Sequence, residues 1–276
     1  MNDNVGAHGS VGGIANSGVA SISNSTISGN SAPNLGGGIF NVGNLTITSS
    51  TINDNSAGGG PMNSPGRGGG VCNLSGALTI VNSTFSGNGA FGNDLKGHGL
   101  GGAIYTGPFE SGSGAVTTLT LRNSTLSDNQ ANDGGGIYNY QVPDTTSLVE
   151  ISNAILSAGA SGENIFNDGG TVTSDGYNVS SDNGGGFLNS PGDQINTDPL
   201  LGPLQDNGGP TLTHALLPGS PAIDAGDPSF TPPPSYEQRG RCFVRVFNDR
   251  IDVGSFEEQP QPRCPTPRPR PTPRPR

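Results

Sequence analysis

The histidines are the first side chains in this sequence to consider for chemistry, because imidazole serves both as a metal ligand and as a general base. There are three, His8, His98 and His214. They stand too far apart in the sequence to suggest a metal site. We therefore predict no metal site and no bound cofactor from them.

Acidic residues in polar loops are the second candidates. Asp54, Asp94, Asp128 and Asp133 lie in segments rich in asparagine and glycine. Carboxylate and carbonyl oxygens in such loops can bind Ca²⁺. However, the repeating Gly-Gly-x-Gly-x-Asp pattern of calcium-binding β-rolls is absent. We interpret these residues as turn formers, and leave weak calcium binding open.

Acid–base catalysis requires a positioned base or a close pair of carboxylates. Residues 1–238 contain only three bases, Arg67, Lys96 and Arg122, and these occupy unrelated positions in the pattern described below. No spacing singles out a pair of acids. We therefore predict no catalytic residue.

The elements that would position these side chains are set by an internal repeat. Its first half is a glycine run, an aliphatic residue and often an asparagine, and its second half is a short strand that alternates apolar and polar residues. The first half occurs at residues 36–41, 68–73 and 134–139, with variants at 101–106 and 12–16; the second half occurs at residues 45–52, 78–85 and 119–126, with partial copies at 22–27 and 149–153.

The repeat predicts a parallel β-helix. In Leu78-Thr79-Ile80, alternation with period two places leucine and isoleucine on one face and threonine on the other. Such a face is too small to be buried within one repeat, whereas stacked repeats bury it in a continuous column. Asparagines that close the unit, such as Asn30, Asn55, Asn88 and Asn129, could form a ladder of side-chain amides. Composition agrees, since 47 glycines and an apolar fraction of 30% argue against a helical domain.

Three regions follow from this pattern. Residues 1–190 are expected to form the parallel β-helix, all-β, right-handed and single-stranded. Residues 191–258 lose the repeat and become rich in proline, which suits an irregular cap over the open last coil. Residues 259–276 contain eight prolines in 18 positions and are expected to form a disordered Pro/Arg tail.

The C-terminal region resembles the module of bacterial "choice-of-anchor Q" surface proteins. The similarity rests on residues 174–182, 198–204 and 207–226, on Gln238-Arg239-Gly240, and on Asp252-Val253-Gly254-Ser255-Phe256-Glu257. The upstream repeats resemble those of polymorphic outer-membrane proteins. Together the resemblances imply a pectin-lyase-like right-handed β-helix that is exported and held at, or released from, the cell surface. They imply no established reaction.

A carbohydrate-active enzyme is the alternative, because the right-handed β-helix is also the scaffold of pectate lyases and polygalacturonases. Gly97-His98-Gly99 and Asn196-Thr197-Asp198 each resemble a tripeptide of polygalacturonases. In those enzymes the second tripeptide comes first, and further motifs accompany both. Here the order is reversed and the companions are missing, so we expect no glycosidase.

Charge and hydropathy limit the partners. Residues 1–238 carry three bases against 18 acids, so we expect no nucleic-acid partner. No stretch is long and apolar enough to cross a membrane. No signal peptide follows Met1, which suggests that the chain is the C-terminal piece of a longer protein.

The cysteines suggest an oxidising compartment. Cys242 and Cys264, near the end of the chain, could form a disulfide. Cys72 occupies a strand position and is expected to be a lone buried thiol.

We expect a non-enzymatic exported surface protein, an adhesin or a stalk, located outside the cell and monomeric. Its partner would be an extracellular polymer, such as a carbohydrate, or a neighbouring cell surface. Recognition would lie in the variable inserts at residues 56–67, 89–100 and 107–118.

Overall fold

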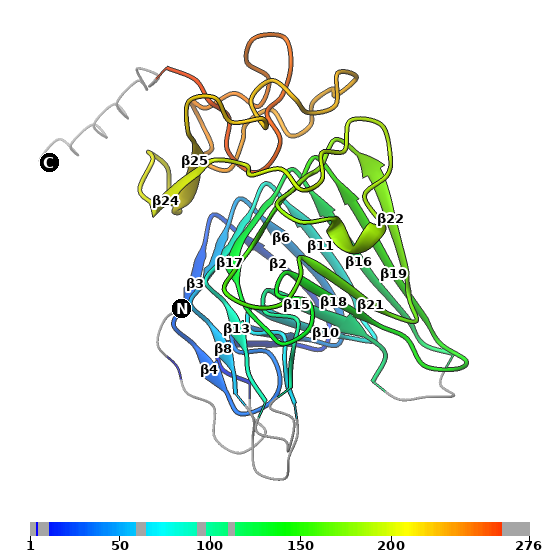
Figure 1. The fold of residues 1–276 in the computed structure, drawn as a ribbon. Coiled ribbons are helices and arrows are strands. Elements are labelled where there is room, and N and C mark those ends of the chain that lie inside the picture. Colours follow the sequence, from blue (N-terminus) through cyan, green and yellow to red (C-terminus); the bar gives the residue numbers. More distant parts are fainter. Residues whose placement is uncertain (1–3, 5–10, 59–64, 93–97, 110–113, 261–276) are drawn as a thin grey trace, which may run out of the picture.

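The chain winds into a parallel β-helix, as the repeat predicts (Figure 1). The computed structural model describes residue 4 and residues 11–58, 65–92, 98–109 and 114–260 of the 276. Each coil contributes one strand to each of three parallel sheets, and equivalent strands of successive coils pair in register.

The first sheet is formed by the residues that follow the glycine runs. Its strands are β1 (Ile14–Asn16), β5 (Ile39–Asn41), β10 (Val71–Leu74), β15 (Ile104–Gly107), β18 (Ile137–Tyr140) and β21 (Ile165–Asp168).

The second sheet is formed by the alternating segments. Its strands are β2 (Val19–Ser23), β6 (Asn44–Thr48), β11 (Ala77–Val81), β16 (Val116–Arg122), β19 (Thr146–Ser152) and β22 (Thr171–Gly176).

The third sheet follows after a two-residue corner. Its strands are β3 (Thr26–Ser28), β7 (Thr51–Asn53), β12 (Thr84–Ser86), β17 (Thr125–Asn129), β20 (Ile155–Ala158) and β23 (Val179–Ser180). Smaller parallel pairings join β4 (Ser31–Ala32), β8 (Ser56–Ala57) and β13 (Gly89–Ala90), and β9 (Gly66–Arg67) with β14 (Gly99–Leu100).

The core is a set of apolar columns inside the coil. Ile80 pairs in register with Ile47 on one side and Leu121 on the other, and all three are completely buried. Ile47, Ile80 and Leu121 therefore lie in one inward column, as predicted. Thr79, between two buried neighbours, points outward and is partly exposed.

The corner between the second and third sheets requires a left-handed residue. Ser49, Asn82, Asn123 and Asn153 occupy this position, with φ near +49°. Asparagine tolerates that region better than most residues because its short polar side chain bonds locally. The sharp corner lets a short strand on each side face the same core.

Asparagine ladders run along the inside of the coil, as predicted. The side-chain amide of Asn55 donates to Asn88 Oδ1 over 2.9 Å, and that of Asn88 donates to Asn129 Oδ1 over the same distance. A second ladder joins Asn41 to Asn73, then reaches Thr106, whose hydroxyl accepts over 3.1 Å. Asn55, Asn88 and Asn41 thus donate to the equivalent asparagine of the next coil, which satisfies these buried amides.

The chain after the last strand of the coil packs against it in two places. Leu188, just after the single 3-10 turn η1 (Gly184–Gly186), packs against the apolar core at its C-terminal end. Residues 199–258, here called the side module, instead lie along the outer face of the third sheet (Figure 1). Their polar groups hydrogen-bond to the outward-facing column of Thr51, Thr84 and Thr125, which is buried beneath them, so these residues lie beside the coil.

The side module is irregular apart from one antiparallel hairpin, β24 (Leu201–Gln205) and β25 (Thr213–Leu216). Its own apolar cluster joins Leu216, Val253 and Phe256 to Ile155 and Val179 of the third sheet. The predicted tail from residue 261 onward lies outside the described residues.

Candidate functional site

The residues considered for catalysis from the sequence are not brought together. His98 directly precedes β14, whereas Asn196-Thr197-Asp198 follows the last coil. Lys96 and Gly97 lie outside the described residues. The two tripeptides are therefore separated along the column.

Of the loop acids, Asp54 lies in a bend, Asp128 at an irregular position within β17, and Asp133 in an isolated bridge with Leu100. Asp54 and Asp128 both have positive φ, and each accepts a hydrogen bond from the preceding side chain, at 2.7 Å from Asn53 Nδ2 and 3.0 Å from Ser127 Oγ. Asp94 lies outside the described residues. Within the described part of the chain, no three His, Cys, Asp or Glu side chains are grouped closely enough to hold a metal ion.

The cysteines divide into two kinds. Cys72 is a free, fully buried thiol, as predicted, and burial raises its pKa to about 12, which keeps it unreactive. Cys242 is disulfide-bonded. Its predicted partner, Cys264, lies outside the described residues.

His214 joins the side module to the third sheet through Ser86. Its Nδ1 lies 2.7 Å from the carbonyl oxygen of Gly202, and its Nε2 lies 3.0 Å from Ser86 Oγ. Because a carbonyl only accepts, Nδ1 carries the proton, Nε2 accepts and Ser86 donates. Burial lowers the pKa of His214 and favours this neutral form.

This geometry resembles a serine activated by a histidine. His214 is only 3% exposed and Ser86 only 5%. Both side chains border a recess of about 360 Å³, together with Ser127, Asp128 and Ser157. Because His214 Nε2 and Ser86 Oγ face each other across the contact between the side module and the coil, we assign this pair to docking of the module.

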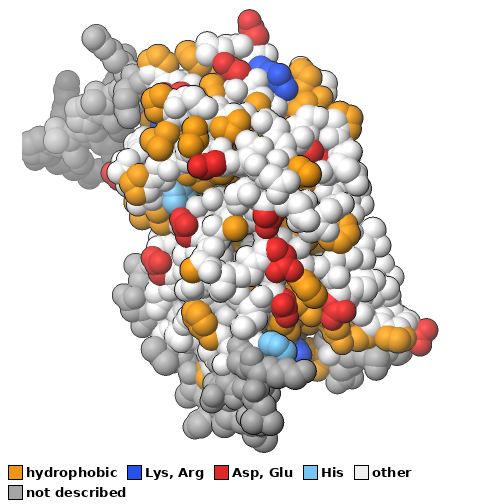
Figure 2. Space-filling model, viewed as in Figure 1, with side chains coloured by type: hydrophobic (Ala, Val, Ile, Leu, Met, Phe, Trp, Pro, Cys, Tyr) orange, Lys and Arg blue, Asp and Glu red, His pale blue; other side chains and the backbone are white. Residues whose placement is uncertain are grey.

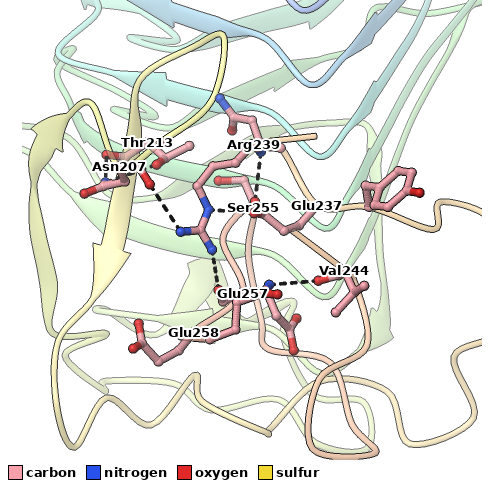
Figure 3. A network of polar contacts seen from close by, with 12 residues as sticks. Asn207, Thr213, Glu237, Arg239, Val244, Ser255, Glu257 and Glu258 are labelled. Carbon is pink, nitrogen blue, oxygen red and sulfur yellow. Dashed lines mark hydrogen bonds and ion pairs between the residues drawn. The ribbon is translucent and has the colours of Figure 1, made fainter. Parts of the chain in front are cut away.

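A buried charged cluster lies inside the side module (Figure 3). Arg239 Nε donates to Glu237 Oε1 over 2.6 Å, and its Nη2 donates to the carbonyl oxygen of Glu257 over 2.6 Å. Its guanidinium also lies between the rings of Phe243 and Phe256, 3.9 and 3.7 Å from their centroids. Arg239 is therefore held on several sides and organises the module's interior.

Glu257 is the most perturbed acid of this cluster. Its side chain is fully buried and accepts from the backbone N–H groups of Phe247, over 3.2 Å, and Asp252, over 3.0 Å. Burial outweighs the nearby charge of Arg245 and raises the pKa of Glu257 to about 8. The cluster holds the module together and is closed to a ligand.

An open groove lies beside the corner of the coil. It has a volume of about 590 Å³. Its floor is formed by residues at or near the ends of second-sheet strands in five successive coils. Its wall is formed by residues of the side-module segment 227–234. The floor residues are Thr48, Val81, Arg122, Ser152 and Asp175, with the corner residues Asn123 and Asn153.

Arg122 is the one basic side chain of this groove. Its Nη2 lies 3.5 Å from Asp175 Oδ2 and 3.8 Å from Glu150 Oε2. The guanidinium is about half exposed, at 48%, so these ion pairs contribute little stability in water. They hold Arg122 across the floor of the groove with donors left for a ligand.

The first sheet carries an outward column of aromatic rings. The rings of Tyr105 and Tyr138 stack at a centroid distance of 5.5 Å, and those of Tyr138 and Phe166 at 5.2 Å. Tyr138 also donates its hydroxyl proton to Asp168. Tyr105 is 1% exposed and Tyr138 is 6% exposed, so this column stabilises the coil.

Sequence reasoning missed the groove and the Ser86–His214 contact. Both depend on where the non-repetitive side module docks, and no periodicity in the sequence gives that position. The one available signal for the groove was Arg122, a base in a region that contains only three.

Three segments of the chain match the repeat of Chlamydia polymorphic membrane proteins, at residues 24–42, 82–107 and 123–140. No curated protein and no solved structure matches the chain significantly. Each matched segment contains a strand of the third sheet and ends in the next strand of the first sheet or just after it. The described residues contain no helix long and apolar enough to span a membrane. The chain is thus a parallel β-helix with repeats similar to those of polymorphic membrane proteins.

Proposed function

We propose that this protein is a surface-exposed, non-enzymatic bacterial protein that acts as an adhesin or stalk. The observation that carries the proposal is the match of three segments to the polymorphic membrane protein repeat. The resemblance of the side module to choice-of-anchor Q proteins supports an exported protein held at or released from the cell surface. Its partner is an extracellular polymer or a neighbouring cell surface, and the protein acts as a monomer.

The architecture supports this function. In-register strands and buried amide ladders give a rigid column, and loops that leave such a column can vary without disturbing its core. Recognition on loops held by a rigid scaffold is a common arrangement. The charge argues against the enzyme alternative, since an acidic body repels acidic polysaccharides. Figure 2 shows acidic side chains across one face and few basic ones.

Adhesion by the inserts can be tested by shortening them. Because β8, β9, β13 and β14 lie at the ends of the first two inserts, the change should be confined to residues 59–64, 93–97 and 110–113, replaced by short Gly-Ser links. We expect binding of the purified protein to a panel of bacterial and host cell surfaces to be lost, while its circular dichroism stays unchanged. Unchanged binding would contradict the proposal.

A further inference from the structure

The groove beside the corner extends along the coil axis. Its floor runs from Thr48 to Asp175 across five successive coils. At the spacing of about 4.8 Å between paired strands, this length is about 19 Å along the coil axis. The groove has a volume of about 590 Å³ and is lined by residues of all five coils. A polymer strand parallel to the axis can contact residues of each of these coils at once.

The chemistry of the lining combines directional polar groups with an apolar wall. Arg122, whose side chain is about half exposed, supplies a planar group that can engage two neighbouring hydroxyls. Asn123 and Asn153 beside it are largely buried, and Asn153 Oδ1 accepts from the backbone N–H of Asp227 over 2.8 Å. The side-module wall contributes the apolar side chains of Phe230, Pro233 and Pro234. A sugar ring presents the same two characters, hydroxyls at its rim and C–H groups on its faces, and aromatic rings pack well against such faces.

The charge of the groove selects among polysaccharides. Arg122 is surrounded by Asp175 and Glu150, and Asp227 lines the opposite wall. The three carboxylates outnumber the single guanidinium, so the groove repels uronates and other anionic sugars. We propose that this groove binds one strand of an uncharged polysaccharide, lying along the coil axis, with Phe230 stacking on a sugar ring and Arg122 bonding to its hydroxyls.

This site is separate from the inserts that the proposed adhesion uses. The groove is built from second-sheet strand ends, the adjacent corner residues and the side module. Failure of one proposal therefore leaves the other untouched, since cell adhesion and oligosaccharide binding are measured separately.

The test is titration calorimetry of the full chain with neutral oligosaccharides of increasing length, using glucose oligomers and N-acetylglucosamine oligomers as probes. We expect at least one series to bind, with affinity rising with length until the groove is filled. Phe230→Ala should weaken that binding about tenfold. Phe109→Ala removes an aromatic side chain that is 61% exposed and does not line the groove, and should leave the affinity unchanged.

Three results would overturn the proposal. They are a lack of binding by every neutral series, equal affinities for the wild type and Phe230→Ala, and tighter binding of oligogalacturonate than of any neutral oligomer. Arg122→Gln separates charge from hydrogen bonding, because it keeps one planar polar group. It should weaken binding of the neutral oligomers and should not improve binding of oligogalacturonate, because without the guanidinium the three carboxylates are unopposed.

Discussion

The position of a residue in a strand determines whether its side chain faces the core or the solvent. Ile80 is fully buried between Ile47 and Leu121, while the adjacent Thr79 points outward. We expect Ile80→Asp to unfold the coil, because an unpaired charge in this column costs more than about 4 kcal/mol. Thermal denaturation followed by circular dichroism measures the effect.

Thr79→Asp is the matched control, since it introduces the same charge one residue away. It should lower the stability by less than about 1 kcal/mol. Similar losses from both substitutions would show that the assigned strand orientation is wrong.

Glu257 gives the side module a pH dependence. Its pKa is raised to about 8 from the ordinary 4.5, so the folded module binds this proton more tightly than the unfolded chain does. The resulting stabilisation is fully present below the unfolded pKa and is lost as the pH rises through about 8. We expect the urea midpoint of the protein to fall between about pH 5 and pH 8 and to level off above that range.

Glu257→Gln isolates this contribution, because the amide does not ionise. The variant should show a shallower fall of the urea midpoint over the same pH range, whatever its absolute stability. His214, whose pKa is lowered, acts in the opposite direction, favouring the folded state at higher pH. An identical slope in the wild type and Glu257→Gln would contradict the role assigned to Glu257.

Among the elements, the contact between the side module and the third sheet depends on Gln238. Its amide donates to Thr51 Oγ1 over 3.0 Å and to Thr211 Oγ1 over 3.1 Å, and its Oε1 accepts from Thr84 over 2.6 Å. Gln238 is fully buried. We expect Gln238→Ala to destabilise module docking by about 2–3 kcal/mol, because several buried partners lose their bonds.

Hydrogen exchange of third-sheet amides measures that docking directly. Gln205→Ala, at an exposed position of β24, should leave the exchange rates unchanged. Faster exchange in both variants, or in neither, would argue that Gln238 does not hold the module.

The elements also show how far the sequence alone can predict this structure. Period-two segments such as residues 78–80 and the recurring Asn88 and Asn129 predicted the strands, the inward columns and the ladder, because local spacing decides them. The docking of Gln238 and His214 onto the third sheet was not predictable in this way. It depends on three-dimensional complementarity between a repeated surface and a segment that has no repeat.

The whole molecule combines a rigid acidic column with loops and one groove. The body of the molecule is acidic, since residues 1–238 carry three bases and 18 acids. Such a body suits presentation of binding surfaces and does not steer an acidic polymer toward a catalytic base.

We propose that this β-helix holds a partner surface without changing it chemically. The most direct measurement coats beads with the purified chain and records both their adhesion to the cell-surface panel and the release of unsaturated or reducing sugars from polygalacturonate, with and without calcium. We expect adhesion that disappears with the shortened inserts, and no sugar release above that of uncoated beads. Sugar release that is lost in His98→Ala, from beads that do not adhere, would contradict this proposal.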